Sequence, residues 1–248
     1  MHQNQFKSLI NLQEFYLHSN FLTNLNEDIF SRLANLKILD LSENFISNLN
    51  FIKSSIKNLK ELNLAGNKLK SVNLTLNENL YEIDLSDNFQ LEYINIIPKD
   101  KLNDLKLNNN KMIRNFSKGY RFLNKLFIKN VSFDLISQMH FGNFFSLIEL
   151  NLSSNILKNF KFNFLKNSRI INLNLSHLGL NLDDNPFVNM EFLRSLDLSG
   201  NKILNSNIFS ITKQLDQLIL ENCSISDNLL AYLNLRGHFL ILNLRHNY

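Results

Sequence analysis

The amino-acid sequence predicts an α/β repeat solenoid, a stack of short coils in which one face is a parallel β-sheet. The first observation behind this prediction is a short string that recurs along the chain. Its copies include LDLSEN at 39–44, LNLAGN at 62–67, IDLSDN at 83–88, LNLSSN at 150–155 and LDLSGN at 196–201. The second observation is the period, because internal repeats of about 20 to 50 residues indicate solenoids, propellers or arrays.

The last position of the string defines eleven repeats with steps of 21 to 24 residues, at 20, 44, 67, 88, 110, 131, 155, 178, 201, 223 and 247. Each repeat is expected to contain one short strand. Leu62 and Leu64 stand two residues apart and point to one face of such a strand, whereas Glu61 and Asn63 point to the other. One coil cannot bury its leucines alone, so successive coils stack and share a continuous core.

The asparagine that ends the string is expected to hold the turn that follows the strand. Its amide offers donors and an acceptor to backbone groups that the turn leaves unpaired. Three repeats lack it and carry Val131, Leu178 and Cys223, so their turns should be looser or be paired through neighbours such as Asn130 and Asn222. The predicted structural asparagine ladder is Asn20, Asn44, Asn67, Asn88, Asn110, Asn155, Asn201 and Asn247.

The arcs between the strands are expected to be extended or 3₁₀ segments on the convex side, with few helices. They hold only about a dozen residues, which is too short for a helix of ordinary length with two flanking turns. Phenylalanines recur in these arcs, for example Phe30, Phe160 and Phe187. We interpret them as a packed aromatic spine and not as ligand contacts.

The full frame, LxxLxLxxNxL, is first complete at Leu12, Phe15, Leu17, Asn20 and Leu22. With these residues the chain resembles the leucine-rich repeat family. The segments DIFSRLANLKILDLSEN and NPFVNMEFLRSLDLSGN are similar to its typical extracellular subclass, which includes Toll-like receptors and chaoptin. The resemblance implies a leucine-rich repeat horseshoe, with a parallel sheet on the concave face, as a single solenoid over residues 1–248. It does not by itself imply a function.

Composition and chain ends narrow the function classes. The formal charge is +4, charged residues make up 19% of the chain, and no basic run appears, so nucleic-acid binding is not predicted. The sequence shows neither a signal peptide nor a membrane span. Because the repeats run to both ends without the Cys-rich caps of extracellular members, we expect a fragment of a longer receptor-like protein, with any membrane attachment in segments missing from this chain.

No pattern of catalytic residues appears. The six histidines are scattered without the close spacing of a metal site, and Gly occurs only six times, without a phosphate-loop spacing. Cys223 occupies an asparagine position of the frame, where an inert buried residue is expected. We therefore predict no enzyme activity, no cofactor, no metal and no small-molecule substrate.

Glycosylation motifs bear on the compartment. Asn73, Asn115 and Asn130 begin Asn-x-Ser/Thr matches and are candidate glycosylation sites, Asn115 first among them. Asn151 and Asn174 begin matches merely because the string LNLS spells one. The motifs favour secretion only weakly.

The residue between the two strand leucines of each repeat is expected to point to the concave face, so these residues show which side chains that face presents. Asp and Asn are the usual choices there, and the departures are Tyr16, Lys106, Phe127 and Ile219. Because neighbouring strands lie about 4.8 Å apart, Lys106, Lys125 and Lys129 are predicted to surround an exposed Phe127 in one patch. An exposed aromatic among basic side chains is the composition of a binding hot spot. The alternative is that carboxylates on adjacent strands pair with these lysines. Those carboxylates are Asp84, Asp104 and Glu149.

A second candidate is the N-terminal half of the same face, where acidic residues outnumber basic ones. Lys106 is the single basic residue against them. An acidic surface of this kind would steer a basic partner. The acidic residues are Glu14, Asp40, Glu43, Glu61, Glu82, Asp84, Asp87 and Asp104.

The first functional hypothesis is a protein–protein interaction module, part of the extracellular or cell-surface region of a receptor or adhesion protein, which binds a protein ligand on its concave face. The alternative is an intracellular, cytoplasmic scaffold or regulatory subunit. The 227 residues from position 20 to position 247 divide into ten steps. Their average is nearer 23 than the extracellular value of about 24, which favours the alternative.

Overall fold

The computed structural model describes residues 5–52, 56–75, 79–97, 100–116, 119–139, 141–157, 161–162, 165, 168–182, 186–187, 189–205, 214–232 and 239–247. Within them the chain forms a parallel β-solenoid with little helix, as predicted. Its residues group into two compact units. Unit 1 is Met1–Leu123 with Asp134–Phe144, and unit 2 is Asn124–Phe133 with Phe145–Tyr248.

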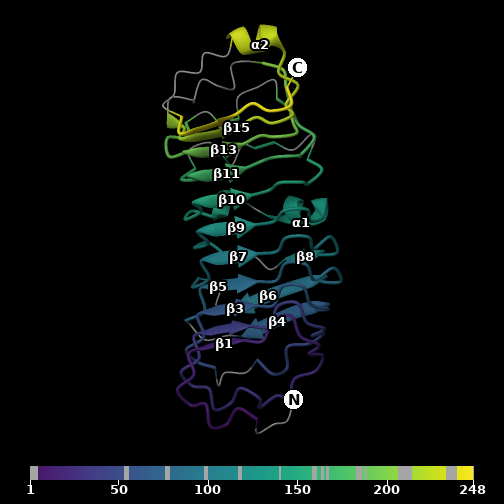
Figure 1. Ribbon diagram of the computed structural model, residues 1–248, viewed down its shortest axis with the longest axis vertical. Helices are drawn as coiled ribbons and strands as arrows, with labels where there is room; N and C mark the ends of the chain where they lie inside the picture. Colours follow the sequence, from purple (N-terminus) through teal and green to yellow (C-terminus); the bar gives the residue numbers. More distant parts are fainter. Residues whose placement is uncertain are drawn as a thin grey trace. The chain divides into compact units, whose positions relative to one another are not determined.

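Unit 1 contains five strands that pair in parallel in chain order (Figure 1). The register places the leucine positions of the repeat opposite one another, for example Leu39 beside Leu62 and Leu62 beside Ile83. These middle residues are 1% exposed or less, so they form the core beneath the sheet. The strands are β1 (Glu14–Tyr16), β2 (Ile38–Asp40), β3 (Glu61–Asn63), β5 (Glu82–Asp84) and β7 (Asp104–Lys106).

Unit 2 contains six strands of the same kind, again parallel and in chain order. Leu150, Leu173, Leu196 and Leu218 lie opposite one another and are buried. The two faces of each strand therefore differ as the sequence predicts, with leucine inward and polar residues outward. The strands are β9 (Lys125–Phe127), β10 (Glu149–Asn151), β11 (Asn172–Asn174), β13 (Ser195–Asp197), β15 (Gln217–Ile219) and β16 (Ile241–Asn243).

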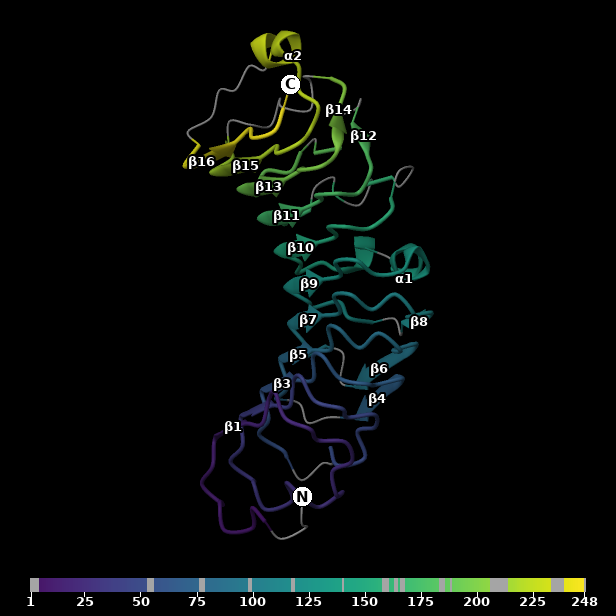
Figure 2. The same cartoon turned by 45° about the vertical axis from the view of Figure 1, so that its right-hand side comes forward.

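The arcs are mostly extended, and some of them pair into small sheets. In unit 1, β4 (Ser71–Thr75), β6 (Tyr93–Ile97) and β8 (Asn115–Phe116) form a parallel sheet on the side of the coils away from β3, β5 and β7 (Figure 2). In unit 2, β12 (Asn181–Leu182) pairs with β14 (Lys202–Ile203). The described helices are α1 (Phe133–Gln138), α2 (Asp227–Tyr232) and the 3₁₀ turn η1 (Phe141–Asn143). No helix in these parts of the chain has the length and apolar character that crossing a bilayer requires.

Phenylalanines of the arcs pack in the core, as expected. Phe30 is 1% exposed, and its ring meets those of Phe15 and Phe51 edge to face, with centroids 6.2 and 5.8 Å apart. Phe187 is also fully buried. Phe160 lies outside the described residues. Edge-to-face contacts of this kind stabilise beyond the area that the rings bury.

The asparagine at the end of the string lies between two coils. Asn44 is 4% exposed, and its Nδ2 donates to the carbonyl oxygens of Leu17 at 2.9 Å and Leu41 at 3.0 Å. Its Oδ1 accepts the N–H of Leu22 at 3.0 Å. The amide thus satisfies backbone groups of its own turn and of the preceding repeat. Amides that donate in the same way are those of Asn67, Asn88, Asn110, Asn155, Asn201 and Asn247.

The three turns that lack this asparagine are held from the following repeat. In each of them the backbone N–H at the replaced position donates to the Oδ1 of the asparagine that ends the string in the following repeat. Asn130 and Asn222, the neighbours proposed from the sequence, adopt left-handed backbone angles, with φ of 51° and 54°. The donor–acceptor pairs are Val131 with Asn155 at 2.8 Å, Leu178 with Asn201 at 3.2 Å and Cys223 with Asn247 at 2.8 Å.

The residue before each asparagine position is left-handed in all eleven repeats, a feature that the sequence analysis missed. The chain leaves the strand there through a turn that requires positive φ, which glycine adopts freely and asparagine or aspartate tolerates. The residues are Ser19, Glu43, Gly66, Asp87, Asn109, Asn130, Ser154, His177, Gly200, Asn222 and His246.

Candidate binding face of the sheet

The Asp or Asn between the strand leucines has a structural role. Its side-chain oxygen accepts the backbone N–H two residues later, as in Ser42 to Asp40 at 2.9 Å and Ala65 to Asn63 at 3.1 Å. This local Asx bond stabilises the exit from the strand. The other acceptors are Asp84, Asn151, Asn174, Asp197 and Asn243.

The four departures predicted from the sequence are the positions where this bond cannot form. The side chains of Tyr16, Lys106, Phe127 and Ile219 offer no carboxylate or amide oxygen to the N–H two residues later. A hydrogen bond of this type contributes about 1 kcal/mol. At four places the sheet face therefore has an aromatic, cationic or apolar side chain instead of an Asx acceptor. After Lys106 the N–H of Asn108 donates to Ser86 Oγ at 3.2 Å instead.

Tyr16 and Ile219 occupy different units. Tyr16, on β1, is 53% exposed, and its hydroxyl donates to Glu14 Oε2 at 2.9 Å. That hydrogen bond and the nearby carboxylates raise the pKa of Tyr16 above its ordinary value. Ile219, on β15, is half-buried and lies in register between Asp197 and Asn243.

Lys106 has a carboxylate partner on the neighbouring strand within unit 1. Its Nζ lies 2.6 Å from Glu82 Oε1, whereas the sequence suggested Asp84 or Asp104. Burial alone would lower the pKa of Lys106, but the bond to Glu82 and the charges of Glu82, Asp84 and Asp104 outweigh it and raise the pKa above its ordinary value. Lys106 is therefore an anchored cation.

The other members of the predicted patch belong to unit 2. Phe127 on β9 is half-buried, whereas an exposed aromatic was expected. Lys125 and Lys129 are exposed, and Lys125 lies in register with Glu149 on β10. Lys125, Phe127 and Lys129 thus share one strand and its exit, and the larger patch that includes Lys106 stays a prediction.

The acidic residues of unit 1 are individually held by neighbouring donors. Tyr81 Oη donates to Glu61 Oε1 at 2.6 Å, Ser19 Oγ donates to Glu43 Oε2 at 2.6 Å, and Asp104 is 8% exposed. These bonds orient the carboxylates along the sheet. Individual carboxylates of the second candidate surface are therefore held in place by hydrogen bonds. The attraction of this surface for a basic partner stays a prediction.

The Tyr81 phenol should ionise at an unusually high pH in an alkaline titration. Its hydrogen bond to Glu61 is the largest cause of a pKa raised from 10.0 to about 12, followed by burial and the charge of Glu61. Because the folded-state pKa is higher than that of the unfolded chain, the stabilisation is complete below about pH 10 and is lost as the pH rises through about 12. We expect phenol absorbance to show this late transition.

The matched variants are Glu61→Gln and Tyr81→Phe. Glu61→Gln should move the transition toward pH 10, because the amide carries no charge. Tyr81→Phe should remove it and so assign it. A Tyr81 transition already near pH 10 in the unaltered protein would contradict the contact.

The candidate glycosylation sites differ in their surroundings. Asn73 on β4 and Asn115 on β8 are exposed, and Asn130 is half-exposed in its turn. In contrast, Asn151 and Asn174 accept their Asx bonds from the N–H groups two residues later. Glycosylation at Asn73, Asn115 and Asn130 stays a prediction.

Cys223 has the surroundings of a structural residue. Its Sγ lies 3.3 Å from the Leu198 carbonyl oxygen, to which it donates as the asparagine amides do elsewhere. Burial raises the pKa of the thiol to about 11, although backbone hydrogen bonds from Asn201 and Gly200 act in the opposite direction. A thiol in this state is a poor nucleophile. Across the described residues no group of three or more His, Cys, Asp or Glu side chains could hold a metal ion.

Comparison with known proteins is consistent with this architecture. A family model described as "Leucine rich repeat" matches residues 10–69, and the solved structures with this fold include the functional domain of InlJ from Listeria monocytogenes. The chain has a leucine-rich repeat fold. Leucine-rich repeat scaffolds are generally not catalytic, and such domains typically bind other proteins. No curated protein sequence matches the chain.

Three solved structures show how far the similarity reaches. The InlJ domain has a TM-score of 0.70 and 21% identity, covering 97% of this chain and 55% of that one. Toll in the Toll–Spätzle complex of Drosophila has a TM-score of 0.64 and 20% identity, covering 98% of this chain and 39% of that one. The TLR13–ssRNA13 complex has a TM-score of 0.50 and 20% identity, covering 98% of this chain and 45% of that one. The leucine-rich repeat chain therefore spans about half, or less, of each of these chains.

Proposed function

We propose that this leucine-rich repeat chain is the ligand-binding part of a receptor or cell-adhesion protein and engages a protein ligand through its sheet face. The observation that carries the proposal is the loss of the Asx bond at Tyr16, Lys106, Phe127 and Ile219. Proteins usually depart from a local structural rule at functional positions, where another role offsets the loss of stability.

The replacing side chains suit a protein ligand. Aromatic residues are enriched at the centres of interfaces, and a polar rim commonly surrounds them. On β9, Phe127 stands beside Lys125, and Lys129 follows at the strand exit. The regular Asp and Asn positions on the neighbouring strands supply polar surroundings.

An extracellular or cell-surface setting is part of the proposal. The similarity in fold to the Toll ectodomain and to an internalin supports it, as do the exposed motifs at Asn73 and Asn115. The spacing of the repeats supports the second candidate, an intracellular scaffold that would present the same face to a protein. A protein and not a nucleic acid is the proposed ligand in both settings, because the chain lacks a basic run.

The test begins by locating the ligand on the chain. A photo-reactive amino acid is placed at position 127 or 219 on the sheet face, or at position 204, where the exposed Leu204 lies on an arc, as the control. The proposal predicts that one protein cross-links from 127 and 219 but not from 204. Cross-linking from 204 alone would place the ligand on the arcs and contradict the proposal.

Substitutions at Ile219 then separate stability from binding. Ile219→Asn can accept the N–H of Glu221, as Asn174 accepts that of Ser176, whereas Ile219→Ala cannot. We expect the asparagine variant to be more stable than the alanine variant by about 1 kcal/mol in denaturant unfolding. Both variants should bind the cross-linked ligand about tenfold more weakly, because each removes an interface side chain.

The matched control is Asn63→Ala on β3, which removes a regular Asx bond. It should lose about 1 kcal/mol of stability and keep its affinity for the ligand. Equal stability of the two Ile219 variants would refute the Asx explanation. Unchanged affinity in both of them would remove this part of the face from the proposed interface.

A further inference from the structure

We infer that a hollow on the sheet face of unit 2 receives an arginine side chain of the protein ligand. The hollow has a volume of about 580 Å³ and lies over the ends of β11, β13, β15 and β16. Its lining includes His177, Asp197, Ile219, Glu221 and His246. This inference rests on the proposed function and specifies the chemistry that the ligand presents at one place on the face.

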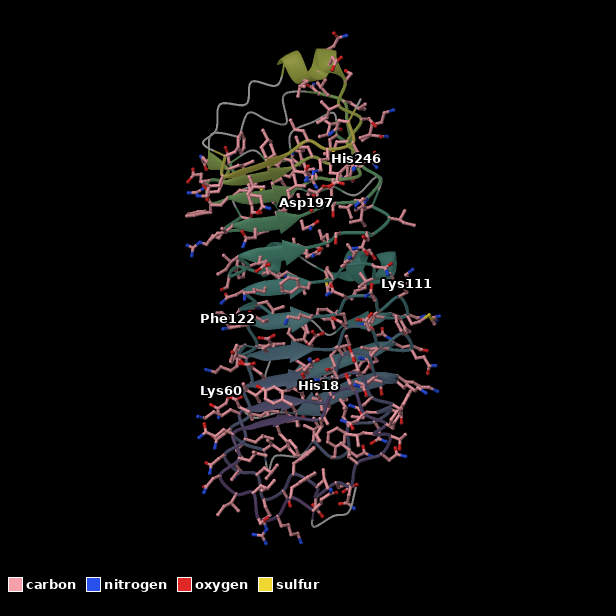
Figure 3. All side chains as sticks on the ribbon, viewed as in Figure 1. His18, Lys60, Lys111, Phe122, Asp197 and His246 are labelled. Carbon is pink, nitrogen blue, oxygen red and sulfur yellow. The ribbon has the colours of Figure 1, made fainter. Side chains whose placement is uncertain are left out.

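One wall of the hollow depends on a glycine. Gly200 is left-handed, with φ of 67°, and the His177 ring lies where a Cβ at position 200 would be. A residue with a side chain would therefore displace His177. In Figure 3 the labelled residues Asp197 and His246 lie over the strands of this unit.

Both carboxylates of the hollow are held in place. Asp197 Oδ1 accepts the N–H and the hydroxyl of Ser199 at 2.9 and 2.6 Å, and its Oδ2 accepts Asn174 Nδ2 at 3.1 Å. Glu221 Oε2 accepts Asn243 Nδ2 at 3.1 Å. Fixed carboxylates lose little freedom when they bind a cation, which favours association.

These carboxylates lack a full cationic partner among the residues that the structure describes. Glu221 Oε1 lies 3.7 Å from His246 Nε2, and its side chain is 39% exposed. Arg245, level with Glu221 in the next repeat, is exposed and forms no ion pair with it. The hollow therefore presents negative charge to the ligand.

The remaining lining favours arginine. Ile219, half-buried, offers an apolar surface for a methylene stem, and long basic side chains pack their stems on such surfaces. The planar guanidinium matches carboxylates with its rigid fork and stacks on aromatic rings such as the His177 imidazole. Ile219 is also one of the four positions where the Asx bond is absent, so independent observations converge on this place.

The test uses small probes on the full chain. N-acetyl-arginine amide is titrated while amide chemical shifts are followed by NMR, and N-acetyl-citrulline amide is its neutral analogue of the same shape. We expect saturable shifts at Ile219, Glu221 and Asn243 with the arginine probe. The citrulline probe should bind at least about fivefold more weakly, because it lacks the charge.

Charge-neutralising variants test whether the arginine probe binds at the two carboxylates of the hollow. Glu221→Gln and Asp197→Asn should each weaken the arginine probe about threefold, and together about tenfold. Asp197→Asn keeps the fold, because Asn63 and Asn174 make the same Asx bond. Glu149→Gln on β10, outside the hollow, is the matched control and should leave the affinity unchanged.

Equal binding of both probes, or an affinity unaffected by Glu221→Gln and Asp197→Asn, would overturn the inference. Such a result would leave the proposed function standing if the Ile219 variants still lose the protein ligand. If the arginine probe binds the hollow but the Ile219 variants keep full affinity for the ligand, the hollow is a cation site outside the ligand interface, and this part of the face is removed from the proposed function.

Discussion

Replacing Asn201 with alanine lowers the free energy of unfolding by about 3 kcal/mol, which is more than the same change costs at Asn67. Asn201 is 3% exposed, and its Nδ2 donates to the carbonyls of Leu175 and Leu198 at 2.8 Å each. Its Oδ1 accepts the N–H groups of Leu178 and Leu180 at 3.2 and 3.1 Å. Truncation removes the amide partner of the N–H groups of Leu178 and Leu180 and of the Leu175 carbonyl, whereas the Leu198 carbonyl still accepts the Cys223 thiol at 3.3 Å.

The difference from Asn67 comes from the preceding repeat. Asn67 Oδ1 accepts the N–H of Ile46, and the repeat that contains Ile46 also has Asn44. The repeat before Asn201 has Leu178 in place of an asparagine, and Asn201 accepts the N–H of Leu178 in addition to the bonds that Asn67 makes. We expect Asn67→Ala to cost about 2 kcal/mol in denaturant unfolding.

Asn20→Ala is the control for the Asn201 prediction. Asn20 is exposed and donates to Leu17 and His18 within its own turn, so its loss should cost less than about 1 kcal/mol. Equal losses at positions 201 and 67 would show that the missing asparagine of the preceding repeat does not increase the demand on Asn201.

Gly200→Ala should be destabilising, by about 2 to 3 kcal/mol, for two separable reasons. The backbone is left-handed at φ of 67°, which costs an L-residue about 1 kcal/mol or more. In addition, the new Cβ would overlap Nδ1 and Cε1 of the His177 ring, so this exposed side chain must leave its position, which adds about 1 kcal/mol. Thermal or denaturant unfolding measures the sum.

Gly66→Ala isolates the backbone cost. Gly66 has φ of 65°, but a Cβ there would come no closer than 3.4 Å to Glu43. Its substitution should cost only about 1 to 2 kcal/mol. Adding His177→Ala to Gly200→Ala should remove the extra cost of Gly200→Ala over Gly66→Ala. An extra cost that persists without the imidazole would mean that the imidazole is not what the new methyl group meets.

Several features of the fold could be predicted because they depend on one repeat. The alternation of Leu62, Asn63 and Leu64 determines which side of a strand is buried, and the recurring string determines which residues of adjacent strands are paired. The low helix content followed from the short arcs. Leucine positions such as Leu39 and Ile83 lie in register, as the alignment of the repeats implies.

Other features left a signal that was not recognised. Gly66, Asn109 and Gly200 all precede the asparagine position and all tolerate positive φ, yet Glu43 and His177 at the same position conceal the rule. A second ladder was missed in the same way. Asn35, Asn58 and Asn79 each stand three residues before a strand, and their side chains donate to carbonyls of the preceding repeat.

The pairing partners of the candidate site required the structure. Lys106 has acidic neighbours at several positions, and only side-chain geometry shows that Glu82 at 2.6 Å is its closest partner. The half-burial of Phe127 likewise depends on the side chains around it. The hollow beside Ile219 combines residues from repeats eight to eleven, each of which is unremarkable within its own repeat.

The sequence by itself determined the repeat, the strand positions, the inward leucines and the four departures from Asp or Asn on the sheet face. These properties follow from periodicity, because every coil must bury the same side of the same short strand. Only the tertiary structure decided the bonds that asparagines make to preceding coils, the ion pair of Lys106 and the hollow near Gly200. Those features depend on contacts between residues more than twenty positions apart, which become neighbours only when the coils stack.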